Sequence, residues 1–437
     1  MFKGLAVFKK FQNRSKHDVF KNMAILASGA VVARIIGLGS TPILTRIYTP
    51  EHFGLLSVFM AALAMIIPFT TLRYSIAIPL LKNSATAMNL VVSTVIILCI
   101  VTVAVSIILG FFSSSIFELF SLNSIVEYWW LLPIAVFGSG MYEILRSWFT
   151  RQKEFKTLAK TDVYVTAGGA LLKIGMGLMG LKPMGLLIGS VFTSIIGVVP
   201  LLLKSYSSFR LHQRFLRISR MKLLLKHYLE YPKYRLPSQF ILALSVQAPL
   251  LILANFFGTD TVGQFSLALM VLSIPVSLLG TSMGQAYYAE IAKIGRKQPE
   301  KILDITTHIT RRLFLFSIIP FFIILFFSPW LFSFIFGEIW RESGEFARLL
   351  SIYMLTTFIS APLVNALSVF EKQSLFLKLN IIRAGVLFMV FGMAYWLNMD
   401  SKETVLFYSI VLSIHYIYVS VMVFKVIRDA VLMNKKR

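Results

Sequence analysis

The sequence has little charge and almost no cysteine. Only 14% of its 437 residues are charged and 57% are hydrophobic, which gives a mean hydropathy of +0.77. Ordinary soluble domains carry about a quarter charged residues, so this composition excludes a water-soluble globular protein. The single cysteine, Cys99, excludes an intramolecular disulfide. We therefore interpret the chain as an integral membrane protein.

The sequence also lacks the motifs of common catalytic sites. It contains no Gly-x-x-x-x-Gly-Lys-Ser/Thr loop for nucleotide phosphates, no His-Glu-x-x-His zinc motif and no Gly-x-Ser-x-Gly nucleophile motif. Outside one basic stretch, the segments between its apolar runs are too short for a catalytic domain. We expect no enzyme, no metal and no cofactor. The movement of a substrate across the bilayer remains as the expected activity.

Long apolar runs dominate what is present. A helix needs about 20 apolar residues to cross the hydrocarbon of a bilayer, and we predict about twelve such spans. The first resembles a signal peptide but is too long for one, so we expect it to be retained. The predicted spans are residues 22–45, 53–72, 88–112, 128–148, 161–181, 183–203, 238–258, 262–284, 312–336, 346–370, 378–397 and 404–425.

The net charge of +24 is distributed unevenly between the predicted loops. Most basic residues fall in the N-terminal segment, in every second loop and in the C-terminal tail, whereas acids collect in the intervening loops. This alternation is the positive-inside pattern of multi-pass membrane proteins. It predicts that both termini are cytoplasmic, and it accounts for the positive charge without nucleic acid as a partner.

The longest polar stretch divides the chain into halves. We predict an N-terminal bundle of six spans over residues 1–203, a basic cytoplasmic linker over 204–237 and a C-terminal bundle of six spans over 238–437. The linker alternates arginine with apolar residues, as in a helix that lies on an anionic leaflet. A weak repeat links the halves, because "PEHFGLLS" (Pro50 to Ser57) and "TDTVGQFS" (Thr259 to Ser266) share acid, glycine and serine at matching positions.

Two basic residues, Arg34 and Lys173, fall near the middle of predicted spans. A central cation costs about 2.5 to 3.5 kcal/mol on insertion scales, so it should face a partner or a polar cavity. Small residues share the helix face of each cation, which leaves room for close packing, for water or for a ligand. A surplus of buried positive charge predicts an anionic ligand, and the alternative is a structural role in bonding helix carbonyls.

Five further residues complete the candidate site. Arg73 and Arg146 would add positive charge from the cytoplasmic side, and Gln247 and Gln285 would bond to uncharged groups of a substrate. Glu143 is the single acid that we place inside a span; it could pair with Arg146 at i, i+3 and is the candidate coupling acid. The alternatives are that Arg146, with Arg348 and Arg383, reaches the membrane surface, and that the amides join helices. We expect no catalytic residue.

Three stretches carry a resemblance to a known family. They are "GSTPILTRIYTPEHFG" (Gly39 to Gly54), "LRYSIAIPLLKN" (Leu72 to Asn83) and "SIPVSLLGTSMGQAYYAEIAK" (Ser273 to Lys293). In these and across most of the chain, the sequence resembles the bacterial polysaccharide-unit flippases, the family that moves O-antigen and other lipid-linked oligosaccharides. They belong to the multidrug/oligosaccharidyl-lipid/polysaccharide exporter superfamily.

The resemblance implies an all-α integral membrane protein with about 12 transmembrane helices. These would form two six-helix bundles around a V-shaped cavity that opens alternately to either side of the bacterial inner membrane. The implied substrate is a polyprenyl-diphosphate-linked oligosaccharide, with H⁺ or Na⁺ as the coupling ion. Membrane lipids and a polysaccharide polymerase are the other expected partners. Two alternatives stay open: a cation-coupled multidrug exporter, and a non-transporting scaffold for polysaccharide assembly.

Overall fold

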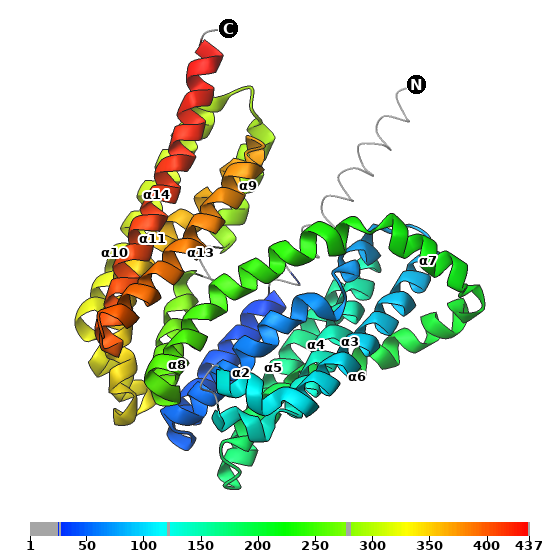
Figure 1. Cartoon of the computed structure of the whole chain (residues 1–437). Coiled ribbons are helices and arrows are strands. Elements are labelled where there is room, and N and C mark those ends of the chain that lie inside the picture. Colours follow the sequence, from blue (N-terminus) through cyan, green and yellow to red (C-terminus); the bar gives the residue numbers. More distant parts are fainter. Residues whose placement is uncertain (1–24, 26–27, 120–122, 277–280, 436–437) are drawn as a thin grey trace. The chain divides into compact units, whose positions relative to one another are not determined.

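A computed structural model describes residues 25, 28–119, 123–276 and 281–435 of the chain. Within these residues every regular element is a helix, as predicted (Figure 1). Nine helices of the described part are long and apolar enough to cross a membrane. Two further predicted spans correspond to the helices α4 and α5, which carry more charges. The long helix α8 contains the predicted span 238–258 and the first part of the predicted span 262–284. The all-α membrane fold is therefore confirmed.

The helices begin and end as follows. The first helix is described over Ser28–Ile47 and precedes α2 (Pro50–Thr70), η1 (Tyr74–Leu80), α3 (Ser84–Leu119), η2 (Asn123–Tyr128), α4 (Leu131–Arg151), α5 (Phe155–Leu178), α6 (Met184–His212), η3 (Gln213–Phe215), α7 (Ile218–His227), η4 (Tyr231–Arg235), α8 (Leu236–Pro275), α9 (Thr281–Ile294), α10 (Pro299–Phe336), η6 (Glu338–Trp340), α11 (Arg341–Leu363), α12 (Asn365–Val369), α13 (Gln373–Trp396) and α14 (Ser401–Lys435).

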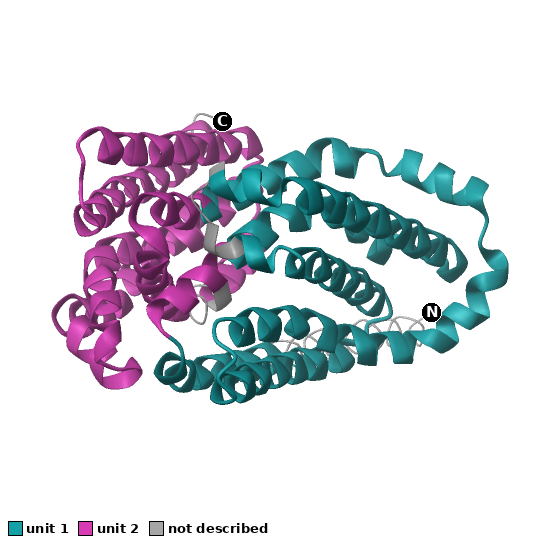
Figure 2. Ribbon diagram, turned by 60° about the horizontal axis from the view of Figure 1, so that its bottom comes forward, with its two compact units in different colours: residues 1–48, 59–247 teal, residues 49–58, 248–437 magenta. Residues whose placement is uncertain are grey.

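The chain divides into two compact units (Figure 2). Unit 1 comprises residues 1–48 and 59–247, and unit 2 comprises residues 49–58 and 248–437. The start of α2 thus belongs to unit 2, while the rest of that helix belongs to unit 1. We predicted a separate linker over 204–237, but its residues continue α6 and form η3, α7 and η4 within unit 1.

The core of unit 1 lies at the predicted cytoplasmic end of its helices. Trp148 and Phe149 of α4 are buried against Tyr74 of η1 and Leu224 of α7. The Tyr74 hydroxyl also donates to the Leu225 carbonyl at 3.1 Å. The short amphipathic helix α7 is therefore held on the bundle by its one buried leucine and by a hydrogen bond.

In unit 2, two glycines of the sequence repeat lie against each other. A Cβ on Gly54 of α2 would collide with the Thr259 carbonyl, and a Cβ on Gly263 of α8 would collide with the Pro50 carbonyl. Each glycine is the fifth residue of its repeat and meets the first residue of the other repeat. The two segments therefore cross symmetrically, and glycine is required at both positions because the backbones approach so closely.

The helix α8 contains the boundary between two predicted spans. The helix continues through Pro249 but breaks at Gly258, where φ is 83°. A proline removes one backbone hydrogen bond, whereas a positive φ interrupts the helical path and strongly favours glycine. The first helix is likewise continuous over Gly37, Gly39 and Pro42.

The close crossing in unit 2 predicts a specific sensitivity to side-chain size. We expect Gly54→Val and Gly263→Val each to lower the stability of the protein by about 1 to 3 kcal/mol, because overpacking shifts backbone and rotamers. Thermal unfolding of the purified protein in detergent measures this. Gly392→Val in α13, where a Cβ would have no neighbour within 4 Å, is the matched control. An equal loss in all three variants would contradict the close approach.

Candidate functional site

The candidate residues lie mostly in unit 1. Arg34, Arg73, Glu143, Arg146, Lys173 and Gln247 belong to it, whereas Gln285 belongs to unit 2. Unit 1 therefore places four of the predicted cations on one bundle of helices. Their partners decide which of them can bind a ligand.

Arg73 and Glu143 form the first ion pair of the bundle. Arg73 precedes η1, in a left-handed backbone conformation, and its Nη1 lies 3.4 Å from Glu143 Oε1 on α4. Its Nη2 donates to Gln239 Oε1 at 3.2 Å, and the Ser75 hydroxyl donates to Glu143 at 2.5 Å. Both charged side chains are mostly buried, at 16% and 24% exposed. Arg73 Nε is buried with no acceptor among the described residues, so one donor of this cation remains unused.

The predicted pairing of Glu143 with Arg146 is wrong. Arg146 Nη1 instead lies 2.6 Å from Asp162 Oδ1 on α5, and the Tyr142 hydroxyl donates to the same carboxylate oxygen at 2.7 Å. Asp162, which sequence reasoning missed, is the second acid inside the bundle. Each of the two acids is thus paired with one arginine. In both pairs the acid and the arginine come from different elements, because helix packing brings them closer together than Glu143 and Arg146 are on α4.

Arg34 lies on the first helix, is exposed and has no hydrogen bond or ion pair with any described residue. Its helix packs along α5, since Gly29 is in close contact with Ala159 and Gly37 faces Thr166. Arg34 therefore lies at the level of residues 159–166 of α5. An apolar helix thus presents a full positive charge that no acid in the described part of the chain neutralises.

Lys173 lies nearer to the end of its helix than to the middle. It lies five residues before the end of α5 at Leu178, because this helix already begins at Phe155. Its aliphatic stem packs against Gly189 of α6, and its carbonyl accepts a hydrogen bond from the Tyr48 hydroxyl at 2.7 Å. The ammonium group has no partner among the described residues. From residue 166 to Lys173, α5 rises about 10 Å, so Lys173 and Arg34 lie at different depths.

Comparison with known protein families identifies the family of this chain. The family described as "Polysaccharide biosynthesis protein" matches residues 43–345, which is more than half of the chain. The chain belongs to this family. No curated protein matches it.

Solved structures show that this polysaccharide biosynthesis protein has the fold of known transporters. It is similar to the lipid II flippase MurJ in an inward closed conformation, with a TM-score of 0.72, 13% identity and coverage of 94% of this chain and 91% of that one. It is also similar to an inward-facing multidrug resistance MATE transporter of the MOP superfamily, with a TM-score of 0.68, 16% identity and coverage of 93% of this chain and 99% of that one. For a MATE transporter from Vibrio cholerae the TM-score is 0.59, the identity is 13%, and the coverage is 94% of this chain and 96% of that one. The resemblance stated from the sequence is confirmed for family and fold.

The two glutamines are not joined to the cations by any hydrogen bond in the described structure. Gln247 is half-buried on α8, and Gln285 is exposed on α9 of the other unit. Neither side chain has a hydrogen-bond partner among the described residues. Their role as substrate contacts stays a prediction, as does that of the four cations.

Unit 2 of the polysaccharide biosynthesis protein contains a polar cluster that sequence reasoning passed over. Arg383 of α13 donates to the Tyr416 hydroxyl at 3.3 Å, and the rings of Tyr353 and Tyr408 lie within 6 Å of each other. His415 of α14 is buried beside this group. The stretch "HYIY" (His415 to Tyr418) inside an apolar run was the available signal. We found no group of three or more metal-ligating side chains among the described residues.

The Arg73–Glu143 pair predicts an asymmetric effect of mutation. We expect Glu143→Gln to lower the stability by about 1 to 3 kcal/mol, because it leaves the buried Arg73 charge without its counter-ion. A second change, Arg73→Gln, should restore much of that loss. Thermal unfolding of the purified variants measures both effects.

Glu338→Gln is the control for this experiment, because Glu338 pairs with Arg341 on the surface, where both side chains are more than half exposed. We expect Glu338→Gln to change the stability by no more than about 0.5 kcal/mol. The ion-pair interpretation is contradicted if Glu143→Gln is as mild as the control, or if the double variant is the least stable of all.

Proposed function

We propose that this protein is a flippase that moves polyprenyl-diphosphate-linked oligosaccharide units from the cytoplasmic to the periplasmic leaflet of the bacterial inner membrane, for the synthesis of a surface polysaccharide. Its family and its transporter fold support transport rather than catalysis. Both termini would be cytoplasmic, and a polysaccharide polymerase would receive the product.

The observation that carries the proposal is the unpaired cation Arg34. Unit 1 contains the four candidate cations Arg34, Arg73, Arg146 and Lys173. The acids Glu143 and Asp162 pair with Arg73 and Arg146, and no described acid pairs with Arg34 or Lys173. Retaining a charge in hydrocarbon is costly unless a partner or water meets it. A diphosphate carries the charge and the acceptor oxygens that an arginine binds best, so the cargo itself would complete the site.

The depths of the two unpaired cations suggest how the headgroup would advance. Arg34 lies level with residues 159–166, near the predicted cytoplasmic end of α5, whereas Lys173 lies near the opposite end. A single diphosphate is too small to contact both at once. We infer that the headgroup meets Arg34 first and Lys173 later, while Arg73 and Arg146 contribute from the cytoplasmic side. Gln247 and Gln285 would bond to sugars.

A proton or a sodium ion is the proposed coupling ion, and Glu143 the proposed coupling acid. A cation that binds this carboxylate competes with Arg73, its partner at 3.4 Å. Ion binding would therefore release Arg73 to face the headgroup. Ion binding and substrate binding would then be coupled, because both would depend on whether Arg73 is paired with Glu143.

The alternative of a multidrug exporter has less support from the charges. Cationic drugs require unpaired acids, whereas Glu143 and Asp162 in the helices of unit 1 each hold an arginine. A scaffold without transport would not need Arg34 or Lys173. Both alternatives make different predictions for the isolated protein.

We predict that Arg34→Glu abolishes glycan export while the protein still inserts into the membrane, because reversed charge repels a diphosphate. The assay measures surface glycan and cytoplasmic lipid-linked oligosaccharide in cells that depend on this protein. Arg46→Glu, the same reversal at an exposed arginine of the same helix, should retain export, and Arg34→Lys should retain part of it. Normal export by Arg34→Glu would remove Arg34 from the mechanism.

Purified protein in liposomes separates the three functions. We expect it to move a fluorescent polyprenyl-diphosphate oligosaccharide between leaflets and to leave a cationic dye such as ethidium in place. Transport of the dye alone would support the multidrug exporter. Transport of neither, with correctly inserted protein, would support the scaffold.

A further inference from the structure

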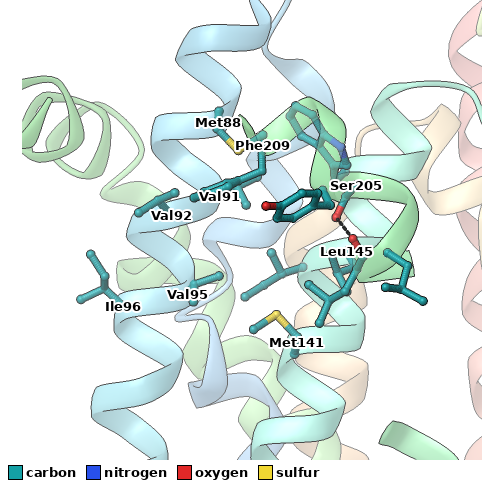
Figure 3. A pocket seen from close by; sticks show the side chains of 14 residues that line it. Met88, Val91, Val92, Val95, Ile96, Met141, Leu145, Ser205 and Phe209 are labelled. Carbon is teal, nitrogen blue, oxygen red and sulfur yellow. Dashed lines mark hydrogen bonds between the residues drawn. The ribbon is translucent and has the colours of Figure 1, made fainter. Parts of the chain in front are cut away.

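An apolar groove opens on unit 1 between the helices α3, α4 and α6 (Figure 3). Its volume is about 530 Å³ and its wall is almost wholly hydrocarbon, with Val92 and Val95 from α3, Met141 and Leu145 from α4, and Phe209 from α6. The Ser205 hydroxyl at its edge is bonded to the Leu202 carbonyl of its own helix at 3.0 Å. This is a volume typical of sites for one ligand of moderate size.

At the predicted cytoplasmic end of the groove, the loop after α6 is held to the start of α3. The fully buried Asn89, next to the groove residue Met88, donates to the Phe215 carbonyl at 3.0 Å. Its Oδ1 accepts the Arg217 backbone N–H at 2.9 Å. One amide thus ties the loop after α6 to the start of α3, and so fixes the backbone on which Arg214 and Arg217 stand.

Three exposed arginines follow the groove residues of α6 toward the predicted cytoplasmic surface. Arg210 lies one helical turn beyond the groove residue Tyr206, on the same face of α6, and Arg214 and Arg217 follow in the tied loop. None of the three forms an ion pair with a described acid. Arg214 is 4.9 Å from the centre of the Phe215 ring, which holds its guanidinium at the loop. A concentrated positive charge therefore stands at the open end of an apolar groove.

One residue of the groove wall, Trp148, carries a buried polar group behind that wall. The indole Nε1 of Trp148, a groove residue that is 2% exposed, is buried without an acceptor among the described residues. Trp148 lies near the cytoplasmic end of α4, with the Arg151 guanidinium 5.3 Å from its ring. Tryptophan at this depth of a bilayer commonly donates to the polar part of lipids.

We propose that this groove is a binding site for one anionic phospholipid of the cytoplasmic leaflet. An acyl chain occupies the groove, and the phosphate binds Arg210, Arg214 and Arg217. Charge complementarity selects an anionic lipid over a neutral one, and the volume suits one acyl chain rather than a much longer polyprenyl tail. The site does not depend on the transport cycle or on its substrate.

The test uses the full-length protein, purified in detergent and stripped of lipid, with phosphatidylglycerol and phosphatidylcholine as probes. Native mass spectrometry counts the bound lipid, and thermal unfolding reports its effect. We expect one phosphatidylglycerol to bind tightly and to raise the unfolding temperature by a few degrees. Phosphatidylcholine should bind about tenfold more weakly or worse.

Two variants separate the acyl and headgroup parts of the site. Val92→Trp fills the groove and should abolish retention of phosphatidylglycerol, whereas Val103→Trp, at an exposed position of α3 outside the groove, should not. Changing Arg210, Arg214 and Arg217 together to Gln should lower the affinity for phosphatidylglycerol about tenfold. The variant should no longer prefer this lipid to phosphatidylcholine. The matched control changes the exposed Lys297, Arg311 and Arg312 of unit 2 to Gln.

Four results would overturn the proposal. The groove is not the site if Val92→Trp binds phosphatidylglycerol as the wild type does. The arginines do not select the headgroup if the wild type binds both lipids equally, or if both triple variants lose the preference alike. If a polyprenyl phosphate displaces phosphatidylglycerol at equal concentration, the groove takes the tail of a polyprenyl lipid instead.

Discussion

The need to neutralise every charge inside hydrocarbon is the constraint on which unit 1 depends. Four candidate cations belong to it, and two acids pair with two of them, Glu143 with Arg73 and Asp162 with Arg146. Arg34 and Lys173 are left without a partner in the described structure. A bundle with this imbalance is stable in a bilayer only with water or an anion beside the free cations. The proposed cargo, the order in which it meets the cations and the proposed coupling through Glu143 all follow from it.

The sequence predicted the architecture well because the bilayer imposes simple rules on it. The length of the apolar runs and the alternation of basic loops are set by membrane thickness and by orientation. These rules located the helices and the two free cations. Similarity between two stretches of the sequence also revealed the pair of repeats, which the structure shows in contact through Gly54 and Gly263.

Features that depend on side-chain partners across helices escaped the sequence. Glu143 lies one turn from Arg146, yet helix packing gives it to Arg73, which is 70 residues away in the chain. We predicted a loop at the charged start of α5, whereas the helix already begins at Phe155. The break in α8 at Gly258, where φ is positive, was not predicted. Each error concerns tertiary contact or backbone conformation, which periodicity does not encode.

The central claim is that the unpaired cations of unit 1 bind a diphosphate headgroup. The most direct measurement is the affinity of the purified protein for a polyprenyl diphosphate, compared with the matching polyprenyl alcohol, in the wild type and in variants with Arg34→Gln and Lys173→Gln. Since hydrogen bonds to charged groups contribute about 1.5 to 3 kcal/mol, each change should weaken the diphosphate about tenfold or more, leave the alcohol unaffected, and lose its effect at high salt. Equal affinity of the wild type and both variants for the diphosphate would contradict the account.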